Sequence, residues 1–290
     1  MKVTGFSFIR NAVKLDYPIV EAVRSILPIC DNFVIAVGKS EDDTLELIKS
    51  IDPVKIRIIE TEWDDSPEMR KGGMVFARET DKALKCIPAD SDWAFYIQGD
   101  EILHEKYLET VNNEMKRWKD DMNVDGLLFN YLHFYGSYDY VANSPRWYNH
   151  EIRIIRNRKS IYSYRDAQGF RQGDNMKLKV KPVDAWIYHY GWVKEPKLMT
   201  RKLANATSFY DGMKWLKEAA SLQSYDYSSI DSLRQFTETH PAVMQERISQ
   251  KNWSFDYDIS FNRLSFRYKA KIFLKKYLGI NSFYENYRIV

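Results

Sequence analysis

Short apolar runs alternate with amphipathic stretches along the first 120 residues of the chain. Short β-rich runs that predict strands occur at 3–9, 33–37, 55–60 and 92–97, and the run at 33–37 is continuously apolar, as is typical of a strand covered on both faces. Apolar residues recur at helical spacing at 19–27, 45–51, 74–85 and 107–119. Repeated strand–helix units of this kind predict a doubly wound α/β sheet.

The second half of the chain is richer in aromatic residues and less regular. Further strands are predicted at 126–131, 151–155 and 185–190, followed by a helix from 196 to about 210. A long aromatic loop is predicted at 133–150. Beyond about residue 215 the strand–helix alternation stops, so we expect an α/β domain at 1–215 and a helical C-terminal extension at 216–290.

Composition narrows the class of protein. The 290 residues are 44% hydrophobic and 29% charged, which allows a sizeable core and excludes a disordered chain. The net charge of +3 is too balanced to indicate a nucleic-acid partner. Cys30 and Cys86 lack metal-binding or catalytic spacing and are interpreted as buried thiols. With no apolar run long enough for a signal peptide or membrane span, we expect a cytoplasmic protein.

Polar residues follow three of the predicted parallel strands, at 10–11, 38–40 and 98–101. The carboxyl ends of such strands meet in one crevice, where ligands of open α/β sheets bind. Gly38 and Gly99 would let the backbone approach a ligand closely. Asp100 directly follows an apolar strand, a position from which a carboxylate could share Mg²⁺ or Mn²⁺ with a diphosphate. The alternative is that Asp100 and Glu101 only cap a turn.

Three segments, in this order and spacing, resemble family 2 glycosyltransferases: 6–11 (FSFIRN), 33–44 (FVIAVGKSEDDT) and 93–103 (WAFYIQGDEIL). The run 186–194 (WIYHYGWVK) is similar to the terminal strand of bacterial members that modify lipopolysaccharide or capsule. The resemblance implies an A-type glycosyltransferase fold, with a mostly parallel sheet and helices on both faces. It also implies a nucleoside-diphosphate-sugar donor, and an acceptor-binding region from about residue 126.

The resemblance also implies roles for individual residues. Ser40, Asp42 and Thr44 match the S-x-D-x-T turn of the family. Gly72 or Gly73, together with Arg78, resembles the family's intervening segment of glycine and arginine. The residues that would bind the nucleotide sugar are Arg10, Asn11, Gly38, Ser40, Asp42, Gly72, Arg78, Gln98 and Gly99.

Two positions depart from the family pattern. Where the family has acidic residues, this chain has Val37-Gly38 after the second strand and Gln98 as the first residue of the D-x-D motif. An amide is a poor ligand for a hard cation. The resemblance therefore places the metal, Mn²⁺ or Mg²⁺, on Asp100, with His189 as second ligand. The alternative for His189 is a core histidine.

A transferase that inverts the anomeric centre needs a base for the acceptor hydroxyl. The candidates are Asp166, Asp139 and Glu151. Asp166 is preferred because the family often has an acidic residue in a loop shortly after a strand like the one predicted at 151–155. The alternative for a loop aspartate is a turn former. The aromatic loop at 133–150 is interpreted as an acceptor-binding surface, with packing under a lid as the alternative.

The basic, aromatic segment 261–290 has two interpretations. It could lie on the inner membrane face, with aromatic rings inserted and Lys and Arg at the headgroups. It could instead pack an apolar stripe, beginning at Phe261, on the catalytic domain. Both interpretations stay open at the level of sequence.

The predicted activity is transfer of a sugar from a nucleoside diphosphate to a hydroxyl of a surface glycan or glycolipid. A non-catalytic sugar-nucleotide or glycan-binding protein is the main alternative, because Val37 and Gln98 replace acidic residues. A nucleotidyltransferase fits less well, since the segment RNAVKLD after the first strand has no glycine for a phosphate-binding loop.

Overall fold

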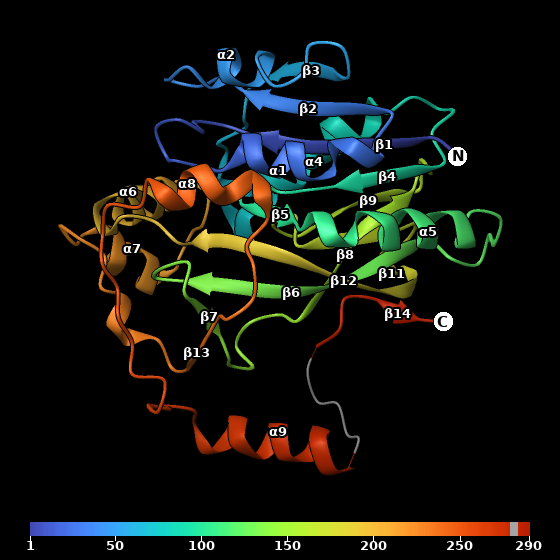
Figure 1. The fold of residues 1–290 in the computed structure, drawn as a ribbon. Coiled ribbons are helices and arrows are strands. Elements are labelled where there is room, and N and C mark those ends of the chain that lie inside the picture. Colours follow the sequence, from blue (N-terminus) through green and yellow to red (C-terminus); the bar gives the residue numbers. More distant parts are fainter. Residues whose placement is uncertain (279–283) are drawn as a thin grey trace.

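The computed structural model describes residues 1–278 and 284–290, and these form a layered α/β structure (Figure 1). The main sheet contains all the described strands except a small separate sheet of β9, β10 and β11. The strands are β1 (Val3–Ile9), β2 (Asn32–Gly38), β3 (Ile56–Thr61), β4 (Trp93–Tyr96), β5 (Glu101–Leu103), β6 (Gly126–Tyr135), β7 (Tyr140–Ala142), β8 (His150–Arg156), β9 (Ile161–Tyr164), β10 (Gly169–Gln172), β11 (Met176–Lys177), β12 (Lys179–Trp192), β13 (Leu233–Gln235) and β14 (Arg288–Ile289).

Helices flank the main sheet, and further helices follow in the C-terminal part of the chain. They are α1 (Ile19–Ile26), α2 (Thr44–Lys49), α3 (Pro67–Arg70), α4 (Met74–Lys85), α5 (Leu108–Trp118), α6 (Pro196–Ala206), α7 (Lys214–Ala220), α8 (Gln245–Ser249) and α9 (Phe266–Leu278). Short 3₁₀ turns lie at Leu27–Ile29, Lys71–Gly73, Glu105–Tyr107, Tyr227–Ser229 and Ala242–Met244.

The sheet begins as a parallel unit and then becomes mixed. Strands β3, β2, β1 and β4 are parallel neighbours, so their carboxyl ends share one edge. Strand β8 lies antiparallel between β4 and β6, and the long β12 runs parallel to β6. The predicted α/β class, with helices on both faces of a largely parallel sheet, is confirmed. The antiparallel insertion of β8 is not visible in its sequence.

Side chains of the parallel strands alternate between two cores. Phe33 and Ile35 of β2 join a cluster with α1 and α5, whereas Val34 and Ala36 join a cluster with α4 on the opposite face. This alternation explains why β2 is apolar throughout: both of its faces are covered. The two layers hold the strand ends rigidly, and the candidate site lies at those ends.

The prediction of a long loop at 133–150 is wrong at 133–135, 140–142 and 150, which lie in strands. Strand β6 continues to Tyr135, and β7 forms a short strand that pairs with it. Phe134, Tyr135 and Tyr138 are buried, and the Phe134 ring stacks on Tyr190 with centroids 4.6 Å apart. Aromatic packing between β6 and β12 therefore uses most of the rings that suggested an acceptor surface, while Tyr148 remains 38% exposed.

The C-terminal segment contributes strands as well as helices. Strand β13 pairs with β7, and β14 pairs with β12. Neither strand was predicted, because two or three residues are too few to show a period.

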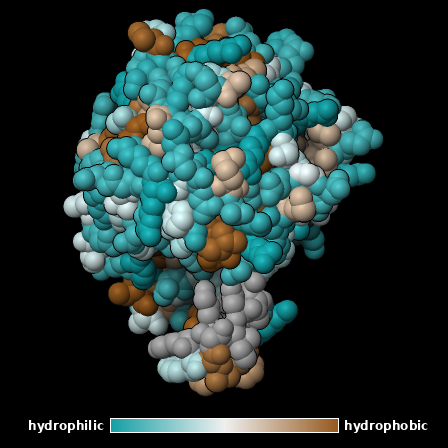
Figure 2. Space-filling view, turned by 90° about the vertical axis from the view of Figure 1, so that its right-hand side faces the viewer, coloured by the Kyte–Doolittle hydropathy of each residue, from teal (hydrophilic) through white to brown (hydrophobic). Residues whose placement is uncertain are grey.

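Helix α9 lies apart from the sheet, below it in Figure 1. Its Phe266 is 88% exposed and Phe273 is 55% exposed. The helix begins at Phe266 rather than at Phe261, and the exposure of Phe266, Ile272 and Phe273 does not match the alternative in which the apolar stripe packs on the domain. Among the described helices, none combines the length and apolar character needed to cross a bilayer. The face seen in Figure 2 is mainly hydrophilic, with hydrophobic residues in separate spots.

Candidate active site

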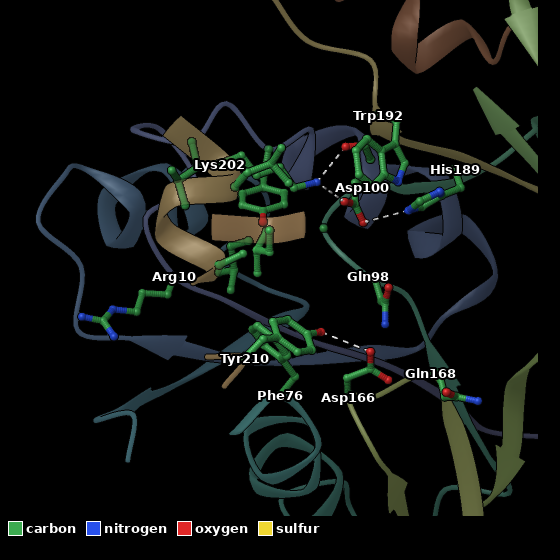
Figure 3. A pocket seen from close by; sticks show the side chains of 18 of the residues that line it. Arg10, Phe76, Gln98, Asp100, Asp166, Gln168, His189, Trp192, Lys202 and Tyr210 are labelled. Atoms are coloured by element: carbon green, nitrogen blue, oxygen red, sulfur yellow. Dashed lines mark hydrogen bonds and ion pairs between the residues drawn. The ribbon is translucent and has the colours of Figure 1, made fainter. Parts of the chain in front are cut away.

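A cavity of about 410 Å³ opens at the carboxyl ends of β1 and β4 (Figure 3). Its walls come from the turn after β4, the loop between β9 and β10, strand β12 and helix α6. Of the predicted site residues, the structure brings six to this cavity: Arg10, Gln98, Gly99, Asp100, Asp166 and His189.

Asp100 lies in the turn between β4 and β5, and its side chain is 13% exposed. The backbone N–H of Tyr190 donates to the Asp100 carbonyl at 2.8 Å, which ties the turn to β12. Lys202 of α6 donates from Nζ to Asp100 Oδ2 at 2.9 Å and to the Gly191 carbonyl at 2.8 Å. Burial opposes ionisation of Asp100, but the cationic groups around it, with Lys202 the foremost, outweigh it and lower the pKa. Asp100 is therefore a carboxylate at neutral pH.

His189 of β12 approaches Asp100 from the other side. Its Nε2 lies 3.8 Å from Asp100 Oδ1, too far for a hydrogen bond. Its Nδ1 lies 3.0 Å from Nδ1 of His133, whose Nε2 lies 2.7 Å from the Tyr148 carbonyl oxygen. Burial lowers the pKa of both histidines. Burial therefore disfavours the charged form of both rings.

Gly191 leaves the space between Asp100 and His189 open. A Cβ atom at this position would lie 2.6 Å from His189 Nε2 and 2.8 Å from Asp100 Oδ2. Only glycine leaves these two polar atoms accessible from the cavity side, so the backbone of β12 helps to shape the site.

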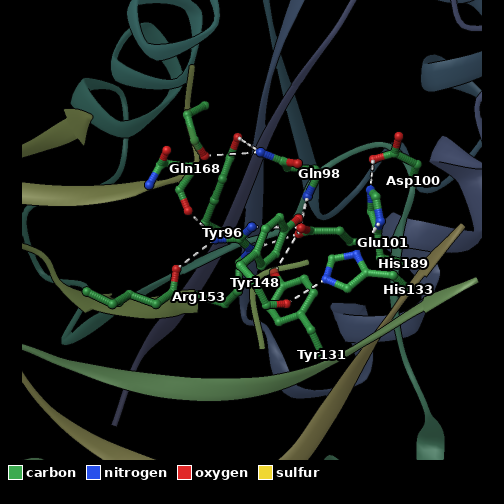
Figure 4. A network of polar contacts seen from close by, with 12 residues as sticks. Tyr96, Gln98, Asp100, Glu101, Tyr131, His133, Tyr148, Arg153, Gln168 and His189 are labelled. Carbon is green, nitrogen blue, oxygen red and sulfur yellow. Dashed lines mark hydrogen bonds and ion pairs between the residues drawn. The ribbon is translucent and has the colours of Figure 1, made fainter. Parts of the chain in front are cut away.

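Glu101, which follows Asp100 in the chain, has a structural role in a network of polar contacts (Figure 4). Its carboxylate accepts from Arg153 Nη2 at 2.7 Å and Nε at 2.8 Å, and both side chains are fully buried. It also accepts from the Tyr131 hydroxyl at 2.8 Å and from the backbone N–H of Gln98 at 3.1 Å. This ion pair fixes the turn that carries Asp100.

Gln98 is used partly for internal contacts. Its side-chain amide donates to the Ala167 carbonyl at 3.1 Å, which links the turn after β4 to the β9–β10 loop. That loop presents Asp166 to the cavity between Arg165 (φ 56°) and Ala167 (φ 64°), two non-glycine residues in the left-handed region. Strain of this kind is found at functional loops.

Asp166 accepts from the Tyr210 hydroxyl at 3.1 Å, and burial raises its pKa. The two other candidate bases do not reach the cavity lining. Asp139 is 61% exposed and bonds to Ser137 and Lys251, whereas Glu151 is buried in β8, where burial raises its pKa to about 8. The structure therefore leaves Asp166 as the one of the three that faces the cavity.

The S-x-D-x-T turn holds a neighbouring loop. Ser40 Oγ accepts from the Asn11 N–H at 3.0 Å, Thr44 Oγ1 accepts from the Ala12 N–H at 2.7 Å, and Asp42 accepts from the Lys14 N–H at 2.6 Å. Gly38, Ser40 and Asp42 line a separate depression rather than the main cavity. These contacts fix the loop after β1, from which Arg10 projects.

Gly72 and Arg78 also lie outside the cavity lining. Arg78 is 55% exposed and lies 3.7 Å from Asp64. It is Gly73 rather than Gly72 that approaches the site: it has φ 72°, and a Cβ there would lie 2.9 Å from Asp166 Cβ. The two glycines are adjacent, and their sequence alone does not distinguish them.

The sequence interpretation missed Lys202 and His133. No pattern separates Lys202 from other cations on its helix, such as Lys197. Lys194, which follows β12, does not line the cavity; it is 1% exposed, and burial lowers its pKa to about 7.

Several solved structures are similar to parts of the chain. A UDP complex of S. aureus TarS 1-349 is 14% identical with a TM-score of 0.39, over 71% of this chain and 64% of that chain. 4-Diphosphocytidyl-2C-methyl-D-erythritol synthase from Anaerococcus prevotii is 13% identical with a TM-score of 0.35, over 65% of this chain and 89% of that one. Glucosyl-3-phosphoglycerate synthase from Mycobacterium tuberculosis, in complex with Mn²⁺, UDP and phosphoglyceric acid, is 18% identical with a TM-score of 0.29, over 46% and 43%.

The chain spans only 39% of the longer TarS structure. No protein-family profile matches the sequence, and no curated protein matches it. Because these similarities are remote and partial, the function proposed below rests on the residues of this chain.

Proposed function

We propose that the chain is a glycosyltransferase that moves a sugar from a nucleoside-diphosphate sugar to a hydroxyl of a surface glycan or glycolipid. The observation that carries the proposal is the convergence of Asp100, His189 and Lys202 at the carboxyl ends of β1 and β4. A carboxylate, an imidazole and an ammonium at such an edge suit a diphosphate and its counter-ion.

A divalent cation, Mn²⁺ or Mg²⁺, fits this donor set. Asp100 and His189 would hold it, in a space that a Cβ at Gly191 would fill. Among the described residues no group of three or more His, Cys, Asp or Glu side chains could hold a metal. Two protein ligands suit these ions, which keep waters and phosphate oxygens in their shells. When bound, the cation would supply positive charge that stabilises the leaving diphosphate.

In the proposed reaction, the acceptor oxygen forms a bond to the anomeric carbon while the bond from that carbon to the diphosphate oxygen breaks. The electron pair leaves with the nucleoside diphosphate, and the configuration inverts. Asp166 accepts the proton of the acceptor hydroxyl, a role that suits a carboxylate whose pKa is raised by burial. Lys202 pairs with the negative charge that develops on the diphosphate. We place the donor and acceptor sites mainly within 1–215, with the acceptor side formed from about 126 onward, and Leu216 also lines the cavity.

Calorimetric titration of UDP and GDP, with and without Mn²⁺, tests the proposal. The variants are Asp100→Ala, Asp100→Asn and, as a matched control, Asp184→Ala on the exposed side of β12. We expect Mn²⁺-dependent nucleotide binding that both Asp100 variants weaken at least about tenfold and that the control retains. Release of nucleoside diphosphate from a panel of donor sugars then identifies the donor.

A non-catalytic nucleotide-sugar-binding protein is the second candidate. It is favoured by the internal use of Gln98 and by the Lys202 ammonium already on Asp100. Nucleotide binding that is independent of Mn²⁺ and unaffected in Asp100→Asn, without diphosphate release, would establish this candidate instead.

We further propose that segment 261–290 contacts an anionic membrane surface, where a lipid-linked acceptor would be found. Phe266, Phe273 and Tyr277 recur at helical spacing and are 88%, 55% and 62% exposed. Residues 261–278 contain six Lys or Arg and no Asp or Glu. Exposed aromatic rings beside basic residues suit an interfacial helix.

Liposome sedimentation tests this contact with the full chain and a Phe266→Ser/Phe273→Ser variant. A truncation is less suitable because it removes β14, which pairs with β12. We expect binding to vesicles containing phosphatidylglycerol, weak binding to phosphatidylcholine alone, and loss of binding in the variant. Equal sedimentation of wild type and variant would contradict the proposal.

A further inference from the structure

His133 and His189 lie side by side on neighbouring parallel strands. They are partners in the register of β6 and β12, and the two residues are 3% and 8% exposed. The His133 ring is enclosed by aromatic neighbours, with the Tyr148 ring centroid at 4.4 Å and the Trp147 centroid at 5.1 Å. The imidazole of His133 is therefore held in one orientation by packing.

The hydrogen-bond partners of this pair determine where the protons lie. A backbone carbonyl can only accept, so His133 Nε2, 2.7 Å from the Tyr148 oxygen, carries a hydrogen. A neutral imidazole has one N–H, so His133 Nδ1 has a free lone pair. His189 Nδ1, 3.0 Å away, must then be the donor. The remaining nitrogen of His189, Nε2, is left with a lone pair directed toward Asp100 (Figure 4).

We infer that His133 is a positioning residue: with the Tyr148 carbonyl, it fixes His189 in the Nδ1–H tautomer and aims the free Nε2 lone pair at the cation site beside Asp100. Two electron-rich atoms, His189 Nε2 and Asp100 Oδ1, then face each other across 3.8 Å. A cation between them makes this arrangement favourable. The inference rests on the proposed function, because the cation is the one assigned to Asp100 and His189 above.

The alternative to this inference is the other tautomer of His189. If His189 were protonated on Nε2, it would donate toward Asp100 and could not ligate a cation. His133 would then serve only to fill space. A hydrogen-bonded partner of a metal-binding histidine typically changes metal affinity ten- to a hundredfold, and a space-filling ring does not.

The first measurement is the tautomer of His189 in the full chain, read from long-range ¹H–¹⁵N spectra of ¹⁵N-histidine-labelled protein without metal or nucleotide. His189→Gln assigns the signals. We expect the Nδ1–H tautomer in wild type and in His133→Gln, whose side-chain oxygen can still accept from His189 and whose amide can still donate to Tyr148. In His133→Phe, which keeps a ring of similar size but no acceptor, this tautomer should no longer be enforced.

The second measurement is Mn²⁺ affinity, from the loss of the free Mn²⁺ signal in electron paramagnetic resonance. We expect His133→Phe to bind Mn²⁺ at least about tenfold more weakly than wild type, and His133→Gln to stay within about threefold. Circular dichroism checks folding, and if His133→Phe does not fold, the wild-type tautomer and the His133→Gln titration still test the inference.

An Nε2–H tautomer of His189 in wild type would overturn the inference, as would a measurable Mn²⁺ affinity that is equal in wild type and a folded His133→Phe. The proposed function fails separately. An Nδ1–H tautomer in a wild-type protein that binds no Mn²⁺ would support the positioning role of His133 and refute metal dependence.

Discussion

The buried ion pair between Glu101 and Arg153 gives the sharpest prediction for stability. Both side chains have no exposed surface, and two hydrogen bonds of 2.7 and 2.8 Å join them. Removing one partner leaves an uncompensated charge inside the protein, which typically costs about 3–5 kcal/mol. This is a large part of a typical unfolding free energy of about 5–15 kcal/mol.

The two single variants should not be equivalent. In Glu101→Gln, the Arg153 guanidinium keeps two carbonyl acceptors, those of Ile152 at 3.0 Å and Gln168 at 3.2 Å. In Arg153→Met, the carboxylate keeps only the Tyr131 hydroxyl and the Gln98 N–H. We therefore expect Glu101→Gln near the lower end of the range and Arg153→Met near the upper end.

Urea unfolding at 15 °C, followed by tryptophan fluorescence and circular dichroism, measures these differences. The double variant Glu101→Gln/Arg153→Met should lose less than the sum of the singles, because no buried charge is left without its partner. A loss below about 1 kcal/mol in both single variants, or strict additivity in the double, would refute the reasoning.

Three further predictions concern two closely packed glycines and a buried carboxyl group. Gly191→Ala would place a Cβ 2.6 Å from His189 Nε2, so Mn²⁺ affinity in a paramagnetic resonance titration should fall at least about tenfold while the melting temperature changes little. Gly126→Ala would place a Cβ 2.5 Å from the Ile154 carbonyl oxygen within the β6–β8 pairing, so urea unfolding should show a loss of about 1–3 kcal/mol. Burial raises the pKa of Glu151 to about 8 from an ordinary value of 4.5, so the folded protein keeps a proton that the unfolded chain releases. The free energy of unfolding should therefore fall as the pH rises from about 5 through 8. Glu151→Gln should remove this loss in melting curves across that range. Unchanged Mn²⁺ binding, an unchanged urea midpoint, or parallel pH profiles would each contradict the corresponding prediction.

Local patterns in the sequence predicted most of the first half of the fold. The helix predicted at 74–85 has those bounds in the structure, and the strand at 3–9 is equally accurate, because each buries one periodic face or an entire apolar run. The pattern failed at 133–150, where long-range stacking of Phe134 on Tyr190 extends a strand that appeared to be a loop.

The candidate site was predictable only in part. Asp100 ends an apolar strand, so its place at the sheet edge follows from the chain itself, and His189 does lie beside it; their roles as metal ligands stay a prediction. Lys202 and His133 reach the site through contacts between residues 102 and 56 positions apart. Such contacts depend on how β12 aligns with β6 and where α6 docks. No local pattern encodes either.

The attachment of the C-terminal strand has a mechanical consequence. Before α9, the N–H of Arg263 donates to the Asp231 carbonyl at 2.8 Å; after it, the N–H of Arg288 donates to the Leu178 carbonyl at 2.9 Å, and β14 runs along the start of β12. The chain is thus attached to the rest of the protein by backbone hydrogen bonds both before and after helix α9. If α9 binds a bilayer as proposed, these two attachments would limit the tilt of the protein relative to the membrane. Because β14 pairs with the first residues of β12, a force on α9 would act on the strand that carries His189 near its other end.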